Sequence, residues 1–294
     1  MRSAFWTLGP ALISAEAEIA IRVTTGVHRL QKAGNRPDEY EDAFAIGTAA
    51  RRLAIADGAS DSYDSGRWAR LLVDAFVDVP PAANVDGVRG WLAEPAREWV
   101  AGLNFAALPW NQQEKARLGA HSTFLGLEFD LVEQGAGNGA PCGAWRAMAI
   151  GDACLFHIRD QGLRVAFPLN RATAFGGSPA LLTTNPAYRG ASVDHLTTAQ
   201  GDLRLGDTVI LATDALAHWF LGRYEQGEQP WLRLPERSNF AVFVAAQRAQ
   251  RRLRNDDVTL IVVHFAAADA GQRLVTTTAI VPKRDSDRWV RWPC

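Results

Sequence analysis

The stretch Leu53-Ala54-Ile55-Ala56-Asp57-Gly58 is an apolar run that ends directly on a carboxylate and a glycine. The same pattern recurs in Val209-Ile210-Leu211-Ala212-Thr213-Asp214 and in Ala147-Met148-Ala149-Ile150-Gly151-Asp152. Each run has the length and composition of a buried β-strand. A buried strand that ends on a carboxylate places that charge at the rim of the core, where several strands can converge. The sequence therefore predicts carboxylates gathered at one end of a layered β structure.

Two further acidic groups, Glu41-Asp42 and Asn255-Asp256-Asp257, border apolar runs in the same way. Carboxylates brought together would repel one another, and their pKa values would rise unless a cation compensates. No cluster of His or Cys accompanies them, and ligand sets made only of oxygen suit a hard divalent ion such as Mg²⁺ or Mn²⁺. The pattern indicates a metal-dependent enzyme.

The remaining periodicity predicts strands and helices in separate groups, which favours an α+β fold over strict β-α alternation. Residues 166–206 are weakly patterned and rich in Gly, Pro and Thr, as is typical of an insertion near a functional site. Strands are expected at 17–31, 43–56, 122–130, 144–150, 153–159, 162–167, 207–213, 258–265 and 273–281. Helices are expected at 67–77, at 87–118 with an interruption near Pro109, at 214–221, at 229–232, and at 239–253, which is amphipathic.

Bulk properties exclude several classes of protein. The 294 residues fit one large layered domain, and the net charge of −1 offers no basic field for nucleic acid. No run approaches the roughly 20 apolar residues that cross a bilayer, so no membrane association is expected. The apolar stretch 4–13 only loosely imitates a secretory signal. Three widely spaced cysteines fit a reducing cytoplasm: Cys142, Cys154 and Cys294.

The acidic motifs, taken in order, resemble those of the metal-dependent protein phosphatases, the type 2C serine/threonine phosphatases, in their bacterial-type form. The matching motifs are Glu41-Asp42-Ala43, Ala56-Asp57-Gly58, Ile150-Gly151-Asp152, Gly206-Asp207 with Ala212-Thr213-Asp214, and Asp256-Asp257-Val258-Thr259. The resemblance covers about residues 20–265. It implies two face-to-face, mostly antiparallel β-sheets flanked by α-helices. It also implies a single domain over residues 1–294, with a flap-like insertion at 166–206 and a C-terminal tail at 270–294.

The resemblance also assigns roles to individual residues. Asp57 would bridge two Mn²⁺ or Mg²⁺ ions, the carbonyl of Gly58 would help hold the second, and Asp214 and Asp256 would complete the first. Glu41 and Asp42 would orient waters, and Asp152 would support a third, weaker ion; the alternative for Asp152 is a plain β-turn. Two ions about 4 Å apart activate a water for in-line attack on phosphorus and neutralise the phosphoryl oxygens.

Several positions depart from the family pattern. The phosphate-holding arginine would be Arg36, one residue out of place, with Arg22 or Arg29 as alternatives. Ala215 follows Asp214 where a glycine is usual, and His121 stands before Ser122-Thr123 where a glycine is usual. His218 stands where another acid is frequent, and we interpret it as a packing residue. Asp207 is interpreted as a turn acid, and Trp289 and Trp292 either dock back on the domain or bind a partner.

The sequence thus predicts a phosphatase that acts on phosphoserine and phosphothreonine in proteins, with a cognate serine/threonine kinase as a further candidate partner. The alternative is a catalytically weak or inactive relative that serves as a regulatory or phosphoprotein-binding module, motivated by Ala215, His218 and His121. A small-molecule phosphatase is disfavoured, because no motif recognises a sugar or a nucleotide.

Overall fold

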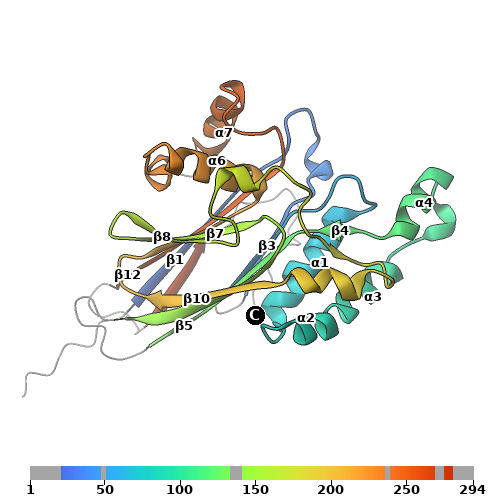
Figure 1. Cartoon of the computed structure of the whole chain (residues 1–294), viewed down its shortest axis with the longest axis horizontal. Helices are drawn as coiled ribbons and strands as arrows, with labels where there is room; N and C mark the ends of the chain where they lie inside the picture. The colour runs from blue at the N-terminus through green and yellow to red at the C-terminus, as the bar shows by residue number, and fades with distance from the viewer. Residues whose placement is uncertain (1–20, 48–50, 133–140, 236–238, 269–274, 281–294) are drawn as a thin grey trace, which may run out of the picture.

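Two β-sheets packed face to face form the centre of the computed structural model (Figure 1), which describes residues 21–47, 51–132, 141–235, 239–268 and 275–280. The six-stranded sheet has the spatial order β13 (Val275–Ile280), β1 (Ile21–Leu30), β12 (Val258–Ala267), β11 (Thr208–Ala212), β7 (Cys154–Arg159) and β8 (Gly162–Phe167). The five-stranded sheet has the order β10 (Thr197–Leu203), β6 (Gly143–Ile150), β5 (Phe124–Leu131), β3 (Arg52–Ala56) and β2 (Ala43–Ile46). A short pair, β4 (His121–Ser122) and β9 (Leu182–Thr183), lies apart. Within the described strands only β13 and β1 run parallel.

Helices cover the outer faces of both sheets (Figure 1). The helices α1 (Ser65–Asp78), α2 (Val85–Trp91) and α3 (Ala93–Ala101) lie on the side of the five-stranded sheet. The helices α6 (Asp214–Glu225) and α7 (Phe240–Ala249) lie on the side of the six-stranded sheet. The helix α4 (Trp110–Leu118) projects from the body, and α5 (Arg189–Ser192) is a single turn. Short 3₁₀ turns complete the chain: η1 (Pro37–Glu39), η2 (Phe105–Ala107), η3 (Ala172–Ala174), η4 (Val193–His195) and η5 (Pro230–Arg233).

The hydrophobic core has three layers, because each sheet is apolar on both faces. Between the sheets, inward-facing residues such as Val27, Leu53 and Leu211 are fully buried. Beneath α1 and α3, the outer face of the five-stranded sheet packs against Trp68 and Trp99. A third cluster joins the outer face of the six-stranded sheet to α6 and α7. The expected α+β sandwich of two mostly antiparallel sheets is therefore confirmed.

Two expectations about individual elements were wrong, and one strand was not expected. The strand expected at 43–56 is two antiparallel strands, β2 and β3, because the chain reverses where Gly47 N donates to the carbonyl of Arg52 at 2.9 Å. The helix expected at 239–253 ends at Ala249, and Arg251 has a φ of +55°, which a helix does not tolerate. The insertion 166–206 contains an edge strand, β10, which lacks apolar alternation because main-chain pairing with β6 defines it.

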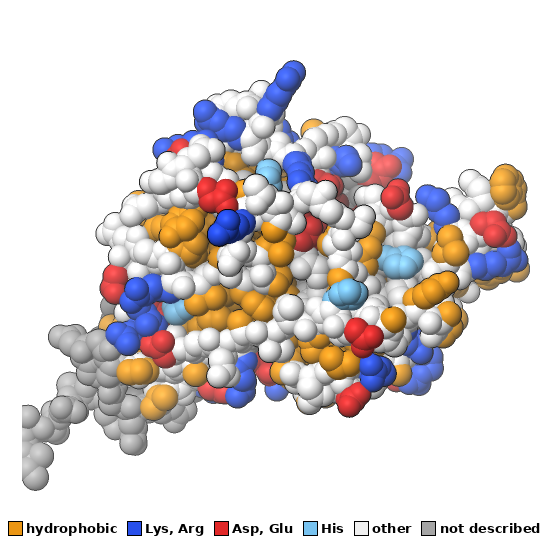
Figure 2. Space-filling model, in the orientation of Figure 1, with side chains coloured by type: hydrophobic (Ala, Val, Ile, Leu, Met, Phe, Trp, Pro, Cys, Tyr) orange, Lys and Arg blue, Asp and Glu red, His pale blue; other side chains and the backbone are white. Residues whose placement is uncertain are grey.

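Some predictions fall outside the described residues: the strand start before residue 21, the signal-like stretch 4–13, and nearly all of the tail, including Trp289, Trp292 and Cys294. Cys142 and Cys154 are buried and unpaired. No described helix has the length and apolar character needed to cross a membrane. On the face shown in Figure 2, acidic and basic side chains are interspersed, in keeping with the net charge near zero.

Candidate metal centre

The register of the strands brings the acidic motifs to one end of the sandwich. In the five-stranded sheet, Ala43 pairs with Ala56, so the residues just outside this pair, Asp42 and Asp57, are adjacent. In the six-stranded sheet, Ala212 pairs with both Leu260 and Cys154, which places the segments that carry Asp214, Asp256 and Asp152 side by side. The predicted convergence of carboxylates from distant parts of the chain is therefore present in the fold.

Asp57 has four carboxylates as electrostatic neighbours: Asp42, Asp214, Asp256 and Asp152. Burial, reinforced by this like charge, raises the pKa of Asp57 well above its usual range. The Asp57 main chain is fixed to the segment 121–123, since Thr123 N donates to the Asp57 carbonyl at 2.9 Å and Ser122 Oγ donates to it at 2.8 Å.

Gly58 lies where the chain passes α1 at close range. A Cβ atom at Gly58 would come within 2.9 Å of the Glu41 carbonyl oxygen and 2.8 Å of the Ser65 carbonyl carbon. Only glycine fits here without moving the backbone. His121, which stands where a glycine is usual, contributes its main chain here: its carbonyl accepts from Ala59 N at 3.0 Å.

Asp42 connects the two sheets. Its side chain is 2% exposed, and its Oδ2 accepts hydrogen bonds from Thr213 Oγ1 at 2.9 Å and Thr259 Oγ1 at 2.7 Å. Its Oδ1 is buried and has no hydrogen-bond partner. Burial is the main cause that raises the pKa of Asp42. A buried carboxylate oxygen without a donor is costly unless a cation compensates it.

Glu41 is held by two serines from the segment that begins α1. Its Oε1 accepts from Ser65 Oγ at 2.6 Å, and its Oε2 accepts from Ser60 Oγ. Its main-chain N donates to Asp257 Oδ2 at 2.7 Å, while Asp257 Oδ1 accepts from Lys32 N at 2.7 Å. Sequence reasoning missed these supports. The run Asn255-Asp256-Asp257 signalled Asp257, whereas nothing marked the two serines.

Asp214, the first residue of α6, is 14% exposed at its side chain. Burial and the neighbouring charges of Asp152 and Asp256 raise its pKa to about 6. Its Oδ2 lies 3.6 Å from Arg254 Nη1, and its Oδ1 is buried without a hydrogen-bond partner. His218, one turn further along α6, packs edge to face on Phe175 with ring centroids 5.6 Å apart, in agreement with the packing role expected for it.

Arg36 is turned toward its own loop. Its side chain is 72% exposed and forms ion pairs with Asp38 at 3.2 Å and Glu39 at 3.9 Å. Of the two alternatives, Arg29 lies over the ring of Tyr40, with 5.4 Å between the guanidinium carbon and the ring centroid. A cleft of about 500 Å³ runs beside Glu41, from this loop to Arg67 and Arg70 on α1.

Within the described segments, no three His, Cys, Asp or Glu side chains are arranged to coordinate one ion. The donor set still fits a hard dication, because it consists of oxygens and includes two buried oxygens without donors, Asp42 Oδ1 and Asp214 Oδ1. Basic groups surround it: Arg254 at Asp214, and Lys32 Nζ 4.0 Å from Asp256 Oδ1.

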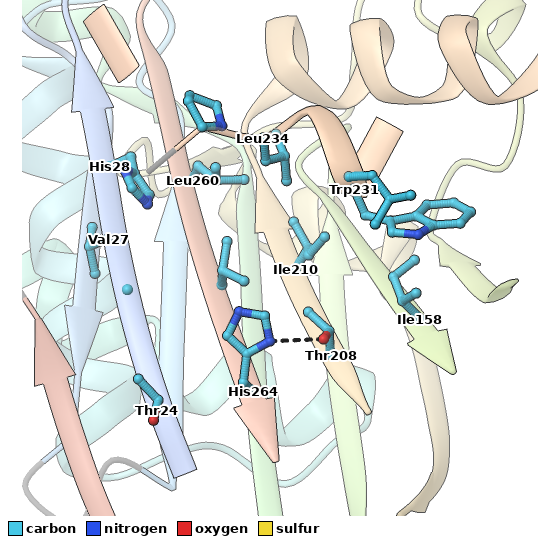
Figure 3. Close-up of a pocket in the computed structure, with 14 residues that line it drawn as sticks. Thr24, Val27, His28, Ile158, Thr208, Ile210, Trp231, Leu234, Leu260 and His264 are labelled. Carbon is cyan, nitrogen blue, oxygen red and sulfur yellow. Dashed lines mark hydrogen bonds between the residues drawn. The ribbon is translucent and has the colours of Figure 1, made fainter. Parts of the chain in front are cut away.

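A second cavity, of about 560 Å³, lies on the outer face of the six-stranded sheet (Figure 3). Trp231 and Leu234 lie over outward-facing residues of β1, β11 and β12, and His264 Nδ1 is bonded to Thr208 Oγ1 at 2.9 Å. Its described lining residues include no Asp, Glu, Lys or Arg, so it lacks the carboxylate oxygens that a hard dication prefers.

Comparison with solved structures shows the same architecture in known phosphatases. The catalytic domain of the serine/threonine protein phosphatase PstP, crystallised with two manganese ions, superposes with a TM-score of 0.54 at 17% identity, covering 84% of this chain and 100% of that one. The photosystem II phosphatase PBCP gives 0.53 at 15% identity, covering 82% and 98%. PstP/Ppp from Mycobacterium tuberculosis gives 0.51 at 17% identity, with the same coverage.

No protein-family model matches the sequence, and no curated protein is similar to it by sequence. The chain has the fold of the PPM-type, or type 2C, serine/threonine phosphatases over most of its length. The resemblance of the motifs is thereby confirmed at the level of the fold.

Proposed function

We propose that this chain is a dication-dependent phosphatase that hydrolyses phosphoserine and phosphothreonine in proteins. The observation that carries the proposal is the meeting of carboxylates from five separate segments at one end of a type 2C-like sandwich, two of whose buried oxygens lack a donor. The two manganese ions of the PstP structure support the choice of metal.

Asp57, Asp214 and Asp256 would hold two ions together with the Gly58 carbonyl, and Asp152 marks the place of a third, weaker ion. Bound dications would supply Lewis acidity, which activates a water and neutralises the phosphoryl oxygens. Asp42, fixed by two threonine hydroxyls, and Glu41, fixed by two serine hydroxyls, would orient waters without moving themselves. Arg36 would hold the substrate phosphate once it leaves its ion pairs with Asp38 and Glu39, which are exposed and therefore weak.

The finer assignments are part of the same proposal. We assign residues 1–294 to one phosphatase-like domain in the cytoplasm, where buried free thiols such as Cys142 and Cys154 persist. Phosphorylated proteins would be its substrates, and a cognate kinase would supply them.

The test is hydrolysis of p-nitrophenyl phosphate and a phosphothreonine peptide by the purified chain, after chelation and after addition of Mn²⁺ or Mg²⁺. Activity should appear only with the dication. Asp57→Asn should abolish it while the circular dichroism spectrum stays unchanged. Asp61→Asn removes an exposed carboxylate from the same loop and should retain full activity. Turnover that survives chelation, or that survives Asp57→Asn, contradicts the proposal.

A second candidate is a phosphoprotein-binding module without catalysis. The ion pair between Arg254 and Asp214 favours it, because a carboxylate already neutralised by arginine is a weaker metal ligand. In that case the folded chain would bind the phosphothreonine peptide in the presence of a chelator and would not hydrolyse it with Mn²⁺.

A further inference from the structure

Arg254 reaches the acidic cluster from a loop that is anchored in the core. The preceding residue, Leu253, is 3% exposed and belongs to the apolar cluster beneath α6 and α7. The main chain is bent just before it, where Arg251 has a φ of +55° and Leu253 N donates to the Gln247 carbonyl at 3.3 Å. The start of the Arg254 side chain is therefore fixed, although the side chain is 46% exposed.

The guanidinium of Arg254 has two partners from different parts of the chain. Its Nη1 lies 3.6 Å from Asp214 Oδ2, and its Nη2 donates to the main-chain carbonyl of Phe175 at 2.5 Å. Phe175 is 4% exposed and packs against His218, so this carbonyl is a firm anchor within the insertion 166–206. Two further cations lie near Asp256: Lys32 Nζ is 4.0 Å from its Oδ1, with 40% of the lysine side chain exposed, and Arg248 Nη2 donates to its main-chain carbonyl.

The charge of Arg254 acts on both carboxylates at this edge of the cluster. Cys154 pairs with Ala212 across β7 and β11, so Asp152 and Asp214, each two residues beyond this pair, lie side by side within range of the charge of Arg254. Asp152 and Asp214 are thus two like charges that share one arginine.

We propose that Arg254 is a built-in counter-cation that takes the place of a divalent ion at the Asp152–Asp214 edge. Arg254 then excludes only the third, weaker ion expected at Asp152, while Asp57, Asp214 and Asp256 still hold two ions, and Arg254 also connects this edge to the insertion 166–206. The inference rests on the proposed function, because it concerns the same carboxylates. A tethered arginine is present at all times, whereas a dication at this edge would have to displace it.

The experiment counts bound ions without reference to catalysis. Isothermal titration calorimetry of the full chain with Mn²⁺, supported by electron paramagnetic resonance of free Mn²⁺, gives the number of ions per chain. The wild-type chain should bind two. Arg254→Met keeps an unbranched side chain up to the position of Nε, removes the charged guanidinium and should bind one ion more. Arg252→Met, an exposed arginine of the same loop, is the matched control and should bind two.

Asp152→Asn in the wild-type background tests the inference from the other side and does not depend on the folding of Arg254→Met. Because the Arg254 guanidinium already compensates the charge at this edge, Asp152→Asn alone should leave the number of bound ions at two. In the double variant Arg254→Met with Asp152→Asn, the extra ion gained by Arg254→Met should be lost. A wild-type count that falls by one with Asp152→Asn, or an unchanged count in a folded Arg254→Met, overturns this inference alone. Absence of Mn²⁺ binding in every variant overturns the proposed function and this inference together.

Discussion

Replacing Asp207 with alanine should destabilise the protein strongly, because this carboxylate is the acceptor of a buried ionic network between the sheets. Asp207 is 1% exposed and accepts from Arg159 Nε at 2.8 Å, Arg159 Nη2 at 2.7 Å and Arg204 N at 2.8 Å. His157 Nε2 lies 2.9 Å away, and its Nδ1 accepts from Trp145 Nε1 at 3.3 Å, so Nε2 carries the proton. The expected turn acid is therefore a core residue.

The structure sets the size of the effect. Removing one partner of a buried ion pair costs about 3–5 kcal/mol, because the other charge is left uncompensated. Arg159 retains a 2.9 Å contact to Asp202, a carboxylate that is 45% exposed, so the lower end applies. Independently, hydrogen bonds from Arg159 and His157 outweigh burial and lower the pKa of Asp207 from 3.8 to about 2, which corresponds to about 2–3 kcal/mol. We expect a loss of about 3 kcal/mol.

Thermal unfolding followed by circular dichroism measures this loss. At about 2–4 °C per kcal/mol, the melting temperature of Asp207→Ala should fall by roughly 6–12 °C. The control Asp130→Ala removes a carboxylate that is 72% exposed and lies 3.2 Å from Arg146, and it should cost less than about 1 kcal/mol.

The pH dependence gives a second readout. Because the pKa of Asp207 is lower in the folded state, its contribution is complete above about pH 4 and disappears as the pH falls toward 2. The difference between wild type and Asp207→Ala should shrink over that range. A loss equal to that of Asp130→Ala, or a difference independent of pH, would refute the reasoning.

Three further outcomes are expected. In the presence of a chelator, the free energy of unfolding should rise by up to about 3 kcal/mol as the pH falls from 7 to about 4, because burial and neighbouring carboxylates raise the pKa of Asp214 from 3.8 to about 6. Saturating Mn²⁺ should abolish this pH dependence. A melting temperature that falls between pH 7 and pH 4 in chelator contradicts the prediction. Gly58→Ala should lower the free energy of unfolding by about 1–3 kcal/mol in chemical denaturation, because its Cβ would meet main-chain atoms within 2.9 Å. The control Gly90→Ala in α2 adds a Cβ that meets nothing within 4 Å, and it should raise the free energy of unfolding by about 0.5–1 kcal/mol. Equal effects of the two substitutions would rule out the close approach at Gly58. Asp257→Ala removes the acceptor of two main-chain N–H groups in the loop between β1 and β2. The substitution should lower the free energy of unfolding by about 2 kcal/mol and should leave the amides of that loop less protected in hydrogen exchange. Unchanged protection would contradict this prediction.

Much of the fold was visible in the sequence, because buried strands require apolar residues whatever their partners are. The runs that end at Asp57, Asp152 and Asp214 marked both the strands and the end of the sandwich at which the acids meet. The strand β10 left no such mark, since main-chain hydrogen bonds to β6 define it and its outer residues face water. The hairpin at Gly47 was also missed, because two short apolar strands in succession look like one long strand.

The candidate site was also only partly predictable from the sequence: its carboxylates were, and the residues that hold them in place were not. Sequence order alone singled out the carboxylates, since acids at the ends of apolar runs are a local pattern. The partners that fix these carboxylates come from far along the chain: Thr259 lies 217 residues from Asp42, and Asp257 lies 216 residues from Glu41. Such pairs follow from strand register, which no local pattern encodes.

By itself, the sequence determined that this chain has layered, apolar strands that end on carboxylates, whose negative charges need compensation where they meet. Tertiary structure alone decided which positive charges stand opposite those ligands. No motif marked Arg254, yet the fold places its guanidinium between Asp214 and the Phe175 carbonyl. The reason is physical: apolar content acts residue by residue, whereas the pairing of charges depends on distances that exist only once the sheets have packed.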